Sequence, residues 1–194
     1  MIKILHRVNN FEKLKATPID LGVEVDIRSN GTDLIIHHDP FKDGELFDDW
    51  LRAFRHKTLI LNVKEEGLED KLIERMNQYE IDDFFFLDQS FPFLRMTANN
   101  GENRCAVRVS EYESIETALS MTGLVKWVWV DCFNNFPLQK KGFDLLKSAG
   151  FSLCLVSPEL QARSHGEIIH MRKLLKHENI QMDAVCTKLP QALS

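Results

Sequence analysis

Two acidic residues stand two positions apart inside an apolar run of the sequence. Glu24 and Asp26 alternate with Val23, Val25 and Ile27. Because successive side chains of a strand point to opposite faces, both carboxylates project to one face and the aliphatic side chains to the other. Two carboxylates on one face repel each other and are costly to desolvate. A hard divalent cation such as Mg2+ or Ca2+ prefers such oxygen ligands, so the spacing predicts a metal site here.

Nearby cations offer a second interpretation of the same acidic pair. Arg7 follows one predicted strand and Lys64 ends another, with Asn62 on the same side as Lys64. If Arg7 or Lys64 neutralises a carboxylate, the pair needs no metal. Alternatively, a cation at the position of Lys64 suits an anionic substrate or its transition state. Both interpretations of Lys64 remain open from the sequence.

Two histidines come from separate strand ends and could face each other across the acidic pair. His6 follows the first predicted strand, and His38 follows an extra strand that returns along the second. Histidine is the natural general acid or base near neutral pH. The arrangement predicts that one imidazole activates a hydroxyl nucleophile while the other protonates the leaving oxygen. Structural or surface positions are expected for the other histidines, which are His37, His56, His165, His170 and His177.

Short β-branched or aromatic runs alternate with longer amphipathic stretches, a pattern typical of βαβ units and a parallel sheet. The predicted strands are Ile2–Leu5, Gly22–Ile27, Thr58–Val63, Phe84–Leu87, Arg104–Val109, Lys126–Val130, Ser152–Val156 and Ala184–Thr187, with the extra strand at Leu34–His37. The predicted helices are Asn10–Ala16, Glu45–Arg55, Leu68–Tyr79, Phe93–Ala98, Ser114–Met121, Leu138–Ala149 and Gly166–His177. Eight strands favour a compact (β/α)8 TIM-type barrel formed by one domain, residues 1–194. A doubly wound sheet would place a glycine-rich loop after its first strand.

In such a barrel, functional residues gather where strands end and the following loops begin. Several further ionisable or polar residues occupy these positions and are possible additional site residues. They are Asn62, Asp88, Arg108, Asp131 and Glu159. The segment Ser157–Leu160, which contains the last of these, is predicted to be a polar turn that opens the final long helix, with Ser157 as its N-cap.

Composition narrows the classes of function. The chain has 194 residues, a net charge of -5 and no basic run, so nucleic-acid binding is not expected. Four cysteines lie inside apolar runs and are expected to be buried thiols. No apolar run approaches the roughly 20 residues of a transmembrane helix, and the first residues do not form a signal peptide. The protein is therefore expected to be cytoplasmic.

Three short motifs in the first forty residues are similar to a known family pattern. His6-Arg7, Glu24-x-Asp26 and His38-Asp39 resemble the start of the glycerophosphodiester phosphodiesterase pattern. Later similarities are Leu61-Asn62-Val63-Lys64, Ser90-Phe91, and Asp183-x-x-x-Thr187 with Pro190. The similarities keep the family's order and cover nearly the whole chain.

The resemblance implies a phosphodiesterase barrel of the phospholipase-C-like group, with a role in lipid metabolism. It implies that His6 and His38 are the acid/base pair and that Arg7 holds the phosphate. Glu24 and Asp26 would ligate a divalent metal, Mg2+ or Ca2+, that polarises a phosphate oxygen. The implied reaction is hydrolysis of a small glycerol- or sugar-linked phosphodiester.

The sequence also departs from the family pattern. Val8 replaces a glycine, and Lys188 stands where an aspartate is common. The family's insertion is missing, since Pro40 to Lys57 fits only one short helix. The third metal ligand of the family is a glutamate two residues before a lysine. Either Asn62 replaces that glutamate, or Lys64 replaces it and Glu66 takes the lysine's place.

The three-carboxylate site is incomplete in both alignments. The site could recruit Asp88 or Asp131, bind metal weakly, or use Lys64 in place of the metal. This incomplete site favours a second hypothesis, a catalytically inactive barrel that binds a phosphorylated ligand or a protein partner. A third hypothesis is Schiff-base chemistry at Lys64, since lysines in barrel strands can form imines with carbonyl substrates.

Overall fold

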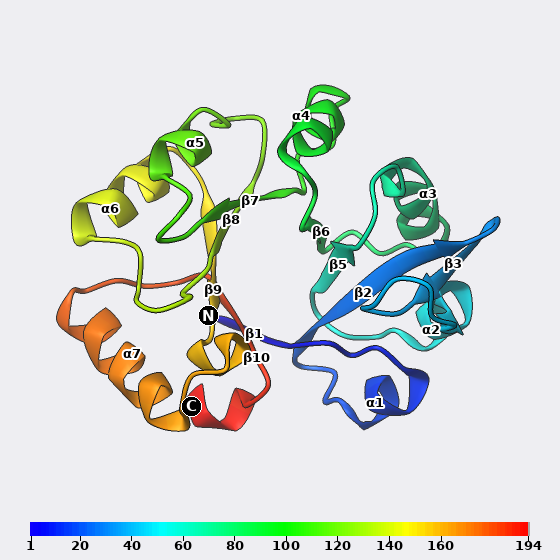
Figure 1. The fold of residues 1–194 in the computed structure, drawn as a ribbon, viewed down its shortest axis with the longest axis horizontal. Helices are drawn as coiled ribbons and strands as arrows, with labels where there is room; N and C mark the ends of the chain where they lie inside the picture. Colours follow the sequence, from blue (N-terminus) through cyan, green and yellow to red (C-terminus); the bar gives the residue numbers. More distant parts are fainter. Residues whose placement is uncertain (194) are drawn as a thin grey trace.

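Eight parallel strands close into a barrel in the computed structural model, which describes residues 1–193 (Figure 1). The barrel strands are β1 (Ile2–Leu5), β2 (Gly22–Asn30), β5 (Leu59–Val63), β6 (Phe84–Leu87), β7 (Ala106–Val109), β8 (Trp127–Val130), β9 (Ser152–Val156) and β10 (Ala184–Thr187). Hydrogen-bonded ladders join β1, β2, β5 and β6 in that order, and a second series joins β7, β8, β9, β10 and β1. The predicted barrel is therefore confirmed.

The barrel closes between β6 and β7, where the pairing is weakest. An isolated parallel bridge between Phe86 and Cys105 joins these strands, and the Phe86 N–H donates to the Arg104 carbonyl oxygen at 2.8 Å. By contrast, β2 and β5 pair over five positions, from Val23–Leu59 to Ile27–Val63. We call the β6–β7 junction the seam.

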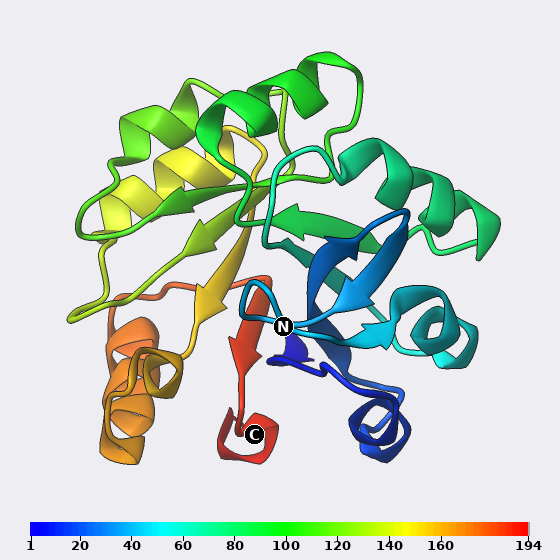
Figure 2. The same cartoon turned by 45° about the vertical axis from the view of Figure 1, so that its right-hand side comes forward.

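Helices cover the outside of the barrel (Figure 2). They are α1 (Phe11–Ala16), α2 (Phe47–Ala53), α3 (Glu69–Gln78), α4 (Phe91–Asn99), α5 (Ile115–Leu119), α6 (Lys140–Ser148) and α7 (His165–His177), with 3-10 helices η1 (Pro158–Gln161) and η2 (Pro190–Leu193). Every predicted helix lies within two residues of an observed one at both ends. In the described part of the chain, none of these helices is long and apolar enough to span a membrane.

Strand alternation produces two separate apolar cores. One lies between strands and helices and contains Val23, Val25 and Ile27, as the alternation in β2 predicts. The other fills the barrel interior, where the rings of Phe85 and Trp127 stack with centroids 4.6 Å apart. All four cysteines are free and buried, as predicted. The filled interior is a packed core, so a ligand can bind only at the ends of the barrel or through its wall.

The connection between β2 and β5 differs from the prediction at the point where its helix begins. The extra strand is β3 (Asp33–Ile36), which pairs antiparallel with β2. The predicted helix Glu45–Arg55 is wrong at its start, because Glu45–Leu46 forms a short strand, β4, that pairs with β3. The helix α2 begins only at Phe47. One helix thus occupies this connection, as the missing family insertion predicts.

The prediction for the segment after β9 is also wrong. Ser157 precedes the separate 3-10 helix η1, and its side chain makes no capping hydrogen bond. Ala162 then adopts a left-handed conformation with φ of 57°, which ends η1 before α7 begins at His165. A left-handed residue cannot continue a right-handed helix. The polar turn therefore forms its own element instead of opening the final helix.

Candidate active site

The carboxyl ends of the barrel strands surround a cavity of about 260 Å³. Most of the predicted site residues line it: His6, Arg7, Glu24, His38, Asn62, Lys64, Asp88, Arg108 and Asp131. Asp26 and Glu159 do not line the cavity, although Asp26 contacts residues that do. We call this cavity the carboxyl-end cavity.

Glu24 lies at the base of the site with its side chain fully buried. Its Oε2 accepts the backbone N–H of Arg7 at 2.6 Å, and its Oε1 accepts the Asn62 side-chain amide at 2.8 Å. Burial and, second to it, the neighbouring Asp26 carboxylate raise the pKa of Glu24 to about 7. Glu24 therefore holds a proton over part of the physiological pH range.

Asp26 is equally buried but lies among cations and amides. Its Oδ2 accepts the Asn9 side-chain amide at 2.6 Å and lies 3.5 Å from Arg7 Nε. Its Oδ1 accepts no hydrogen bond but lies 3.3 Å from the Lys64 ammonium nitrogen. The chain's own cations thus offset the charge of Asp26.

Glu24, Asp26 and Asn62, with Asp88 and Asp131 of the cavity wall, are the residues of this site that could supply oxygen ligands to a divalent metal. They do not fit the three-carboxylate metal site that the family resemblance implies. Among residues 1–193, no group of three or more histidine, cysteine or acidic side chains is placed to hold a metal. Each oxygen of the two carboxylates already faces an N–H donor or ammonium group. The metal at Glu24 and Asp26 stays a prediction, and no step of the chemistry below depends on it.

His6 is largely buried beside Glu24, with its Nε2 3.8 Å from Glu24 Oε2. Burial is the main cause that lowers the pKa of His6 to about 3, and the remaining causes are the cations Arg7, Lys188, Lys13 and Lys64. Its Nδ1 is buried and has no hydrogen-bond partner. The imidazole is therefore neutral at physiological pH, and its unpaired Nδ1 is enclosed by the chain.

His38 is more exposed and is held by its neighbour in the sequence. Its Nδ1 lies 2.8 Å from Asp39 Oδ1, and this contact holds the pKa of Asp39 below its usual range. Nδ1 is thus engaged, which leaves Nε2 as the nitrogen available for proton transfer. The two histidines of the cavity therefore differ in environment, one buried among cations and the other exposed beside a carboxylate.

Alternating charges extend from Lys64 around the cavity wall. The Lys64 ammonium lies 2.9 Å from Asp88 Oδ2, and Arg108 donates to Asp88 Oδ1. Arg108 also lies 3.6 Å from Asp131 Oδ2. Burial opposes ionisation of Asp88, but Lys64 and Arg108 outweigh it and hold the pKa of Asp88 below its usual value. Burial raises the pKa of Asp131, which Arg108 and Gln161 only partly oppose.

The turn after β1 positions Arg7 above the acidic pair. Arg7 adopts a left-handed conformation with φ of 52°, which is uncommon for a residue with a side chain and costs about 1–2 kcal/mol. This conformation accompanies the bond from its N–H to Glu24, while its side chain reaches Asp26. Lys13 donates from Nζ to the carbonyl oxygens of His6 and Arg7, at 3.0 and 2.6 Å. These contacts stabilise a strained backbone at the site.

Seven residues of the cavity were not predicted as site residues: the aliphatic Leu87, Val156 and Leu160, and also Trp129, Phe133, Gln161 and Lys188. Lys188 directly follows β10, so its position at a strand end was a signal for it. Its backbone N–H donates to Oε1 of the buried Glu159 at 3.0 Å. Glu159 also accepts hydrogen bonds from the hydroxyls of Ser157 and Thr187. Glu159 thus positions Lys188 without lining the cavity itself.

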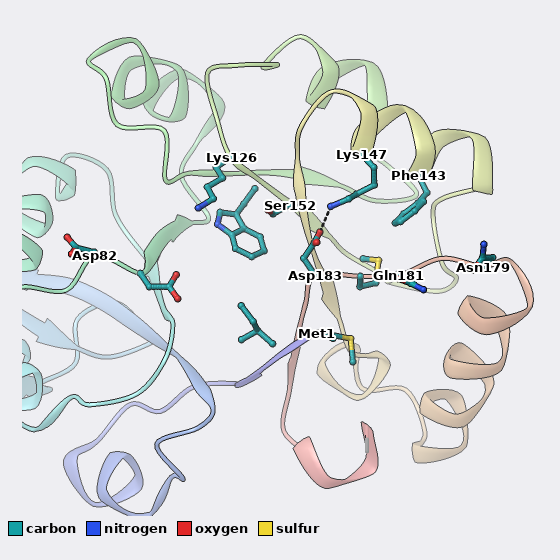
Figure 3. Close-up of a pocket in the computed structure, with 13 residues that line it drawn as sticks. Met1, Asp82, Lys126, Phe143, Lys147, Ser152, Asn179, Gln181 and Asp183 are labelled. Carbon is teal, nitrogen blue, oxygen red and sulfur yellow. Dashed lines mark hydrogen bonds and ion pairs between the residues drawn. The ribbon is translucent and has the colours of Figure 1, made fainter.

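A larger hollow, of about 1080 Å³, lies at the amino ends of the strands (Figure 3). We call it the amino-end hollow. Its lining includes residues that precede or begin strands, among them Met1, Lys126, Ser152 and Asp183. Its Lys147 ammonium forms an ion pair of 2.7 Å with Asp183. None of the predicted site residues lines this hollow.

Comparisons with known proteins find similarity in structure but not in sequence. No protein-family model matches the chain, and no curated protein matches it. A glycerophosphodiester phosphodiesterase from Agrobacterium tumefaciens is similar at 12% identity with a TM-score of 0.70, over 98% of this chain and 96% of that one. A protein from Galdieria sulphuraria that is provisionally named glycerophosphodiester phosphodiesterase is similar at 16% identity with a TM-score of 0.73, over 100% of this chain and 96% of that one.

A solved structure with a different name is also similar. A mutant tryptophan synthase alpha-subunit from Pyrococcus furiosus matches at 13% identity with a TM-score of 0.55, over 98% of this chain and 88% of that one. The TM-scores are higher for the phosphodiesterase structures than for the tryptophan synthase subunit. At such low identities the likeness establishes the fold alone. The chain therefore has the α/β barrel fold that is also found in glycerophosphodiester phosphodiesterase structures.

Proposed function

We propose that the protein is a phosphoric diester hydrolase that cleaves a small glycerol- or sugar-linked phosphodiester by histidine acid/base catalysis. One observation carries the proposal: His6 and His38 line the same small cavity as Arg7, Lys64 and Lys188. Cations favour a phosphate group, and two imidazoles of different environment suit proton transfer to and from its oxygens. The structural likeness to glycerophosphodiester phosphodiesterases gives further support.

The two histidines take different roles in the proposed reaction. The neutral His6 imidazole accepts the proton of the attacking hydroxyl, which belongs to water or to an adjacent hydroxyl of the substrate. His38, whose Nδ1 is held by Asp39, delivers a proton from Nε2 to the leaving alcohol oxygen. Arg7 and Lys64 bind the phosphate and stabilise the charge that grows on its oxygens in the transition state. Lys188 is a third phosphate-binding cation.

Lys64 has a further role in this proposal. Its ammonium lies 3.3 Å from Asp26 and supplies positive charge beside the acidic pair. A divalent metal, Mg2+ or Ca2+, would supply Lewis acidity at Glu24 and Asp26 if it displaced this contact. The reaction as proposed runs without that metal, and the experiment below includes both conditions.

A second candidate function is a barrel that binds a phosphorylated ligand without cleaving it. The engagement of each oxygen of Glu24 and Asp26 by chain donors favours it, because the acids then serve to hold cations. Schiff-base chemistry at Lys64 has less support. The ammonium is held by Asp26 and Asp88, and both ion pairs would have to break before the amine could attack a carbonyl.

The test is a hydrolysis screen over glycerol-linked and sugar-linked phosphodiesters, run with Mg2+, Ca2+, Mn2+ or a chelator. We expect release of an alcohol and a phosphomonoester in the presence of chelator. His6→Ala should lower kcat/KM by about 10²–10⁴-fold, the usual contribution of a general base. Lys126→Ala is the matched control, since Lys126 lines the amino-end hollow, and should leave kcat/KM unchanged.

Three outcomes would separate the hypotheses. Hydrolysis that survives His6→Ala contradicts the proposed site. Activity that requires a metal contradicts the proposed role of Lys64 but not the histidine chemistry. If no diester is cleaved but inorganic phosphate raises the Tm, and Lys64→Met removes this effect, the binding function replaces the catalytic one.

A further inference from the structure

Arg28 lies near the end of β2, two residues after Asp26, and outside the lining of the carboxyl-end cavity. Its side chain is only 15% exposed. Its Nε and Nη2 both donate to the carbonyl oxygen of His38, at 3.2 and 2.9 Å, and its Nη1 donates to the carbonyl oxygen of Lys64 at 3.0 Å. One guanidinium group thus joins the backbones of two residues that line the cavity.

His38 belongs to the loop of residues 37–44, which connects β3 to β4. Residues 39–43 of this loop are exposed, and the side chain of Phe41 is fully exposed. Among the described residues, the other hydrogen bonds of residues 37–44 stay within the loop itself. Arg28 therefore provides the side-chain hydrogen bonds that anchor this loop, and with it His38, to the barrel wall.

The backbone of Lys64, at the other end of this connection, has anchors of its own. Its N–H donates to the carbonyl oxygen of Ile27 at 3.0 Å, next to the ladder between β2 and β5. Its ammonium forms ion pairs with Asp26 and Asp88. Arg28 thus ties a loop with few anchors to a strand end with several. Loss of Arg28 should therefore displace His38 more than Lys64.

A guanidinium group suits this connection better than an ammonium group. It is planar and always charged, and its N–H donors point in fixed directions, whereas an ammonium is a single point charge on a flexible stem. Hydrogen bonds from a charged donor are roughly twice as strong as neutral ones. Glu65 Oε2 lies 3.9 Å from Nη1 and offsets the charge of Arg28. The donors of Arg28 are thus directed at backbone carbonyl groups and not at the cavity.

We propose that Arg28 is a positioning residue, which holds His38 where its Nε2 can protonate the leaving alcohol oxygen. This inference rests on the proposed hydrolase function, in which His38 delivers that proton. Arg28 fixes the carbonyl group of His38, and Asp39 engages its Nδ1, so the residue is held at its backbone and at its ring. Without Arg28 the imidazole keeps its chemistry but loses its alignment with the leaving oxygen.

The test compares two diesters of glycerol phosphate that differ in the leaving group, which is glycerol in one and p-nitrophenol in the other. A p-nitrophenolate anion leaves without a proton from a general acid, whereas a glycerol oxygen needs one. We expect Arg28→Met to lower kcat/KM for the glycerol diester by about 10–100-fold, the scale of a misplacement of about 1 Å. The kcat/KM for the p-nitrophenyl diester should fall by less than about threefold, since proton delivery is not part of that reaction.

Two further variants serve as comparisons. His38→Gln should show the same contrast, and adding Arg28→Met to it should cause no further loss for the glycerol diester, because the two residues act as a unit. Arg104→Met removes a guanidinium that donates to Glu102 and to the carbonyl oxygen of Asp82, and it should leave the ratio of the two kcat/KM values unchanged. The positioning role is wrong if Arg28→Met slows both diesters by the same factor or slows neither.

A proteolysis measurement separates the role of Arg28 from the hydrolase function. Chymotrypsin cleaves after aromatic residues, and Phe41 is fully exposed in the loop that Arg28 anchors. Arg28→Met should raise the rate of cleavage after Phe41 by about tenfold or more, the effect of losing hydrogen bonds from a charged donor, and Arg104→Met should not. If the wild-type protein hydrolyses no diester, faster cleavage in Arg28→Met still supports Arg28 as the residue that positions His38. Equal cleavage rates in the wild-type and Arg28→Met proteins overturn it, whatever the activity of the wild-type protein.

Discussion

The two ends of the barrel both carry charged side chains, but they differ in how those charges are hydrated. At the amino-end hollow, Lys147 and Asp183 pair while about a third of each side chain stays exposed. At the carboxyl-end cavity, Glu24 and Asp26 have no exposed surface and depend entirely on the chain for their partners. The amino-end hollow has about four times the volume, 1080 against 260 Å³.

This difference shows that the larger hollow of the barrel is not the one with the fully buried charges. Burying a charge is costly, and the cost is tolerated only where partners from several strands converge on it. The converging partners shift pKa values, as they do for His6 and Glu24, and shifted pKa values mark functional sites. The Lys147–Asp183 ion pair of the amino-end hollow is partly exposed, so water can replace either partner.

The largest expected effect is the loss of the Lys64 ammonium. Lys64→Met keeps the volume of the side chain but leaves Asp26 fully buried with one cation fewer. Removing one partner of a buried ion pair costs about 3–5 kcal/mol, so we expect the free energy of unfolding in urea to fall by about 3 kcal/mol. The double variant Lys64→Met, Asp26→Asn should recover most of the loss. A loss below about 1 kcal/mol would mean that Asp26 is effectively hydrated.

The pH dependence of stability tests the opposite shifts at His6 and Glu24. The pKa of Glu24 is raised from 4.5 to about 7, so ionisation of Glu24 makes stability fall as pH rises through this window. The pKa of His6 is lowered from 6.5 to about 3, so protonation of unfolded chains makes stability rise as pH rises from 3 to 6.5. The two slopes cancel between pH 4.5 and 6.5 in the wild-type protein.

Each single variant should reveal the slope of the other group. From pH 4.5 to 6.5, the free energy of unfolding should rise by about 3 kcal/mol in Glu24→Gln and fall by about 3 kcal/mol in His6→Gln, since each pH unit is worth about 1.4 kcal/mol per proton. Urea titrations in chelator at several pH values measure both slopes. Parallel profiles in the two variants would contradict the opposed shifts.

The sequence predicted the fold and the site residues correctly where the signal lies in neighbouring residues. The alternation of Glu24 and Asp26 with aliphatic residues predicted which side chains enter the barrel, because a strand has a period of two whatever its partners. It also predicted that His6 and His38, at the ends of separate strands, would reach one place. Their catalytic roles remain predictions.

The sequence did not predict features that depend on contacts between residues far apart in the chain. Glu45 continues a helical pattern, yet its pairing with β3 makes it a strand residue. Glu159 was expected in the site, but its partners Thr187 and Lys188 lie 28 and 29 residues away and no local pattern indicates them. The pKa of His6 likewise depends on burial and on Lys188, which only the closed barrel brings close to it. Such features follow from tertiary packing and have no periodic signal.

A smaller effect is expected at Glu159, whose carboxylate joins η1 to the end of β10. Glu159→Ala leaves the hydroxyls of Ser157 and Thr187 and the Lys188 N–H without their acceptor. An unsatisfied buried group costs about 1–3 kcal/mol, so the free energy of unfolding should fall by about 2 kcal/mol. Because Lys188 lowers the pKa of His6, its displacement should also raise that pKa, which an NMR titration of His6 detects. Glu159→Gln keeps an acceptor and should restore most of both values.

The smallest effect is expected at the amino-end hollow and completes the comparison of the two ends. Lys147→Met is the counterpart of Lys64→Met, because both replace an ammonium that pairs with an aspartate. Asp183 is partly exposed and keeps the backbone N–H of Leu153 as a donor at 2.7 Å, so water can replace the lost cation. Exposed ion pairs contribute about 0–1 kcal/mol, and we expect a change in this range in the same urea titration. Kinetic parameters for diester hydrolysis should not change. If Lys147→Met instead destabilised the protein as much as Lys64→Met, burial would not distinguish the two ends, and the difference in their charges would need another cause.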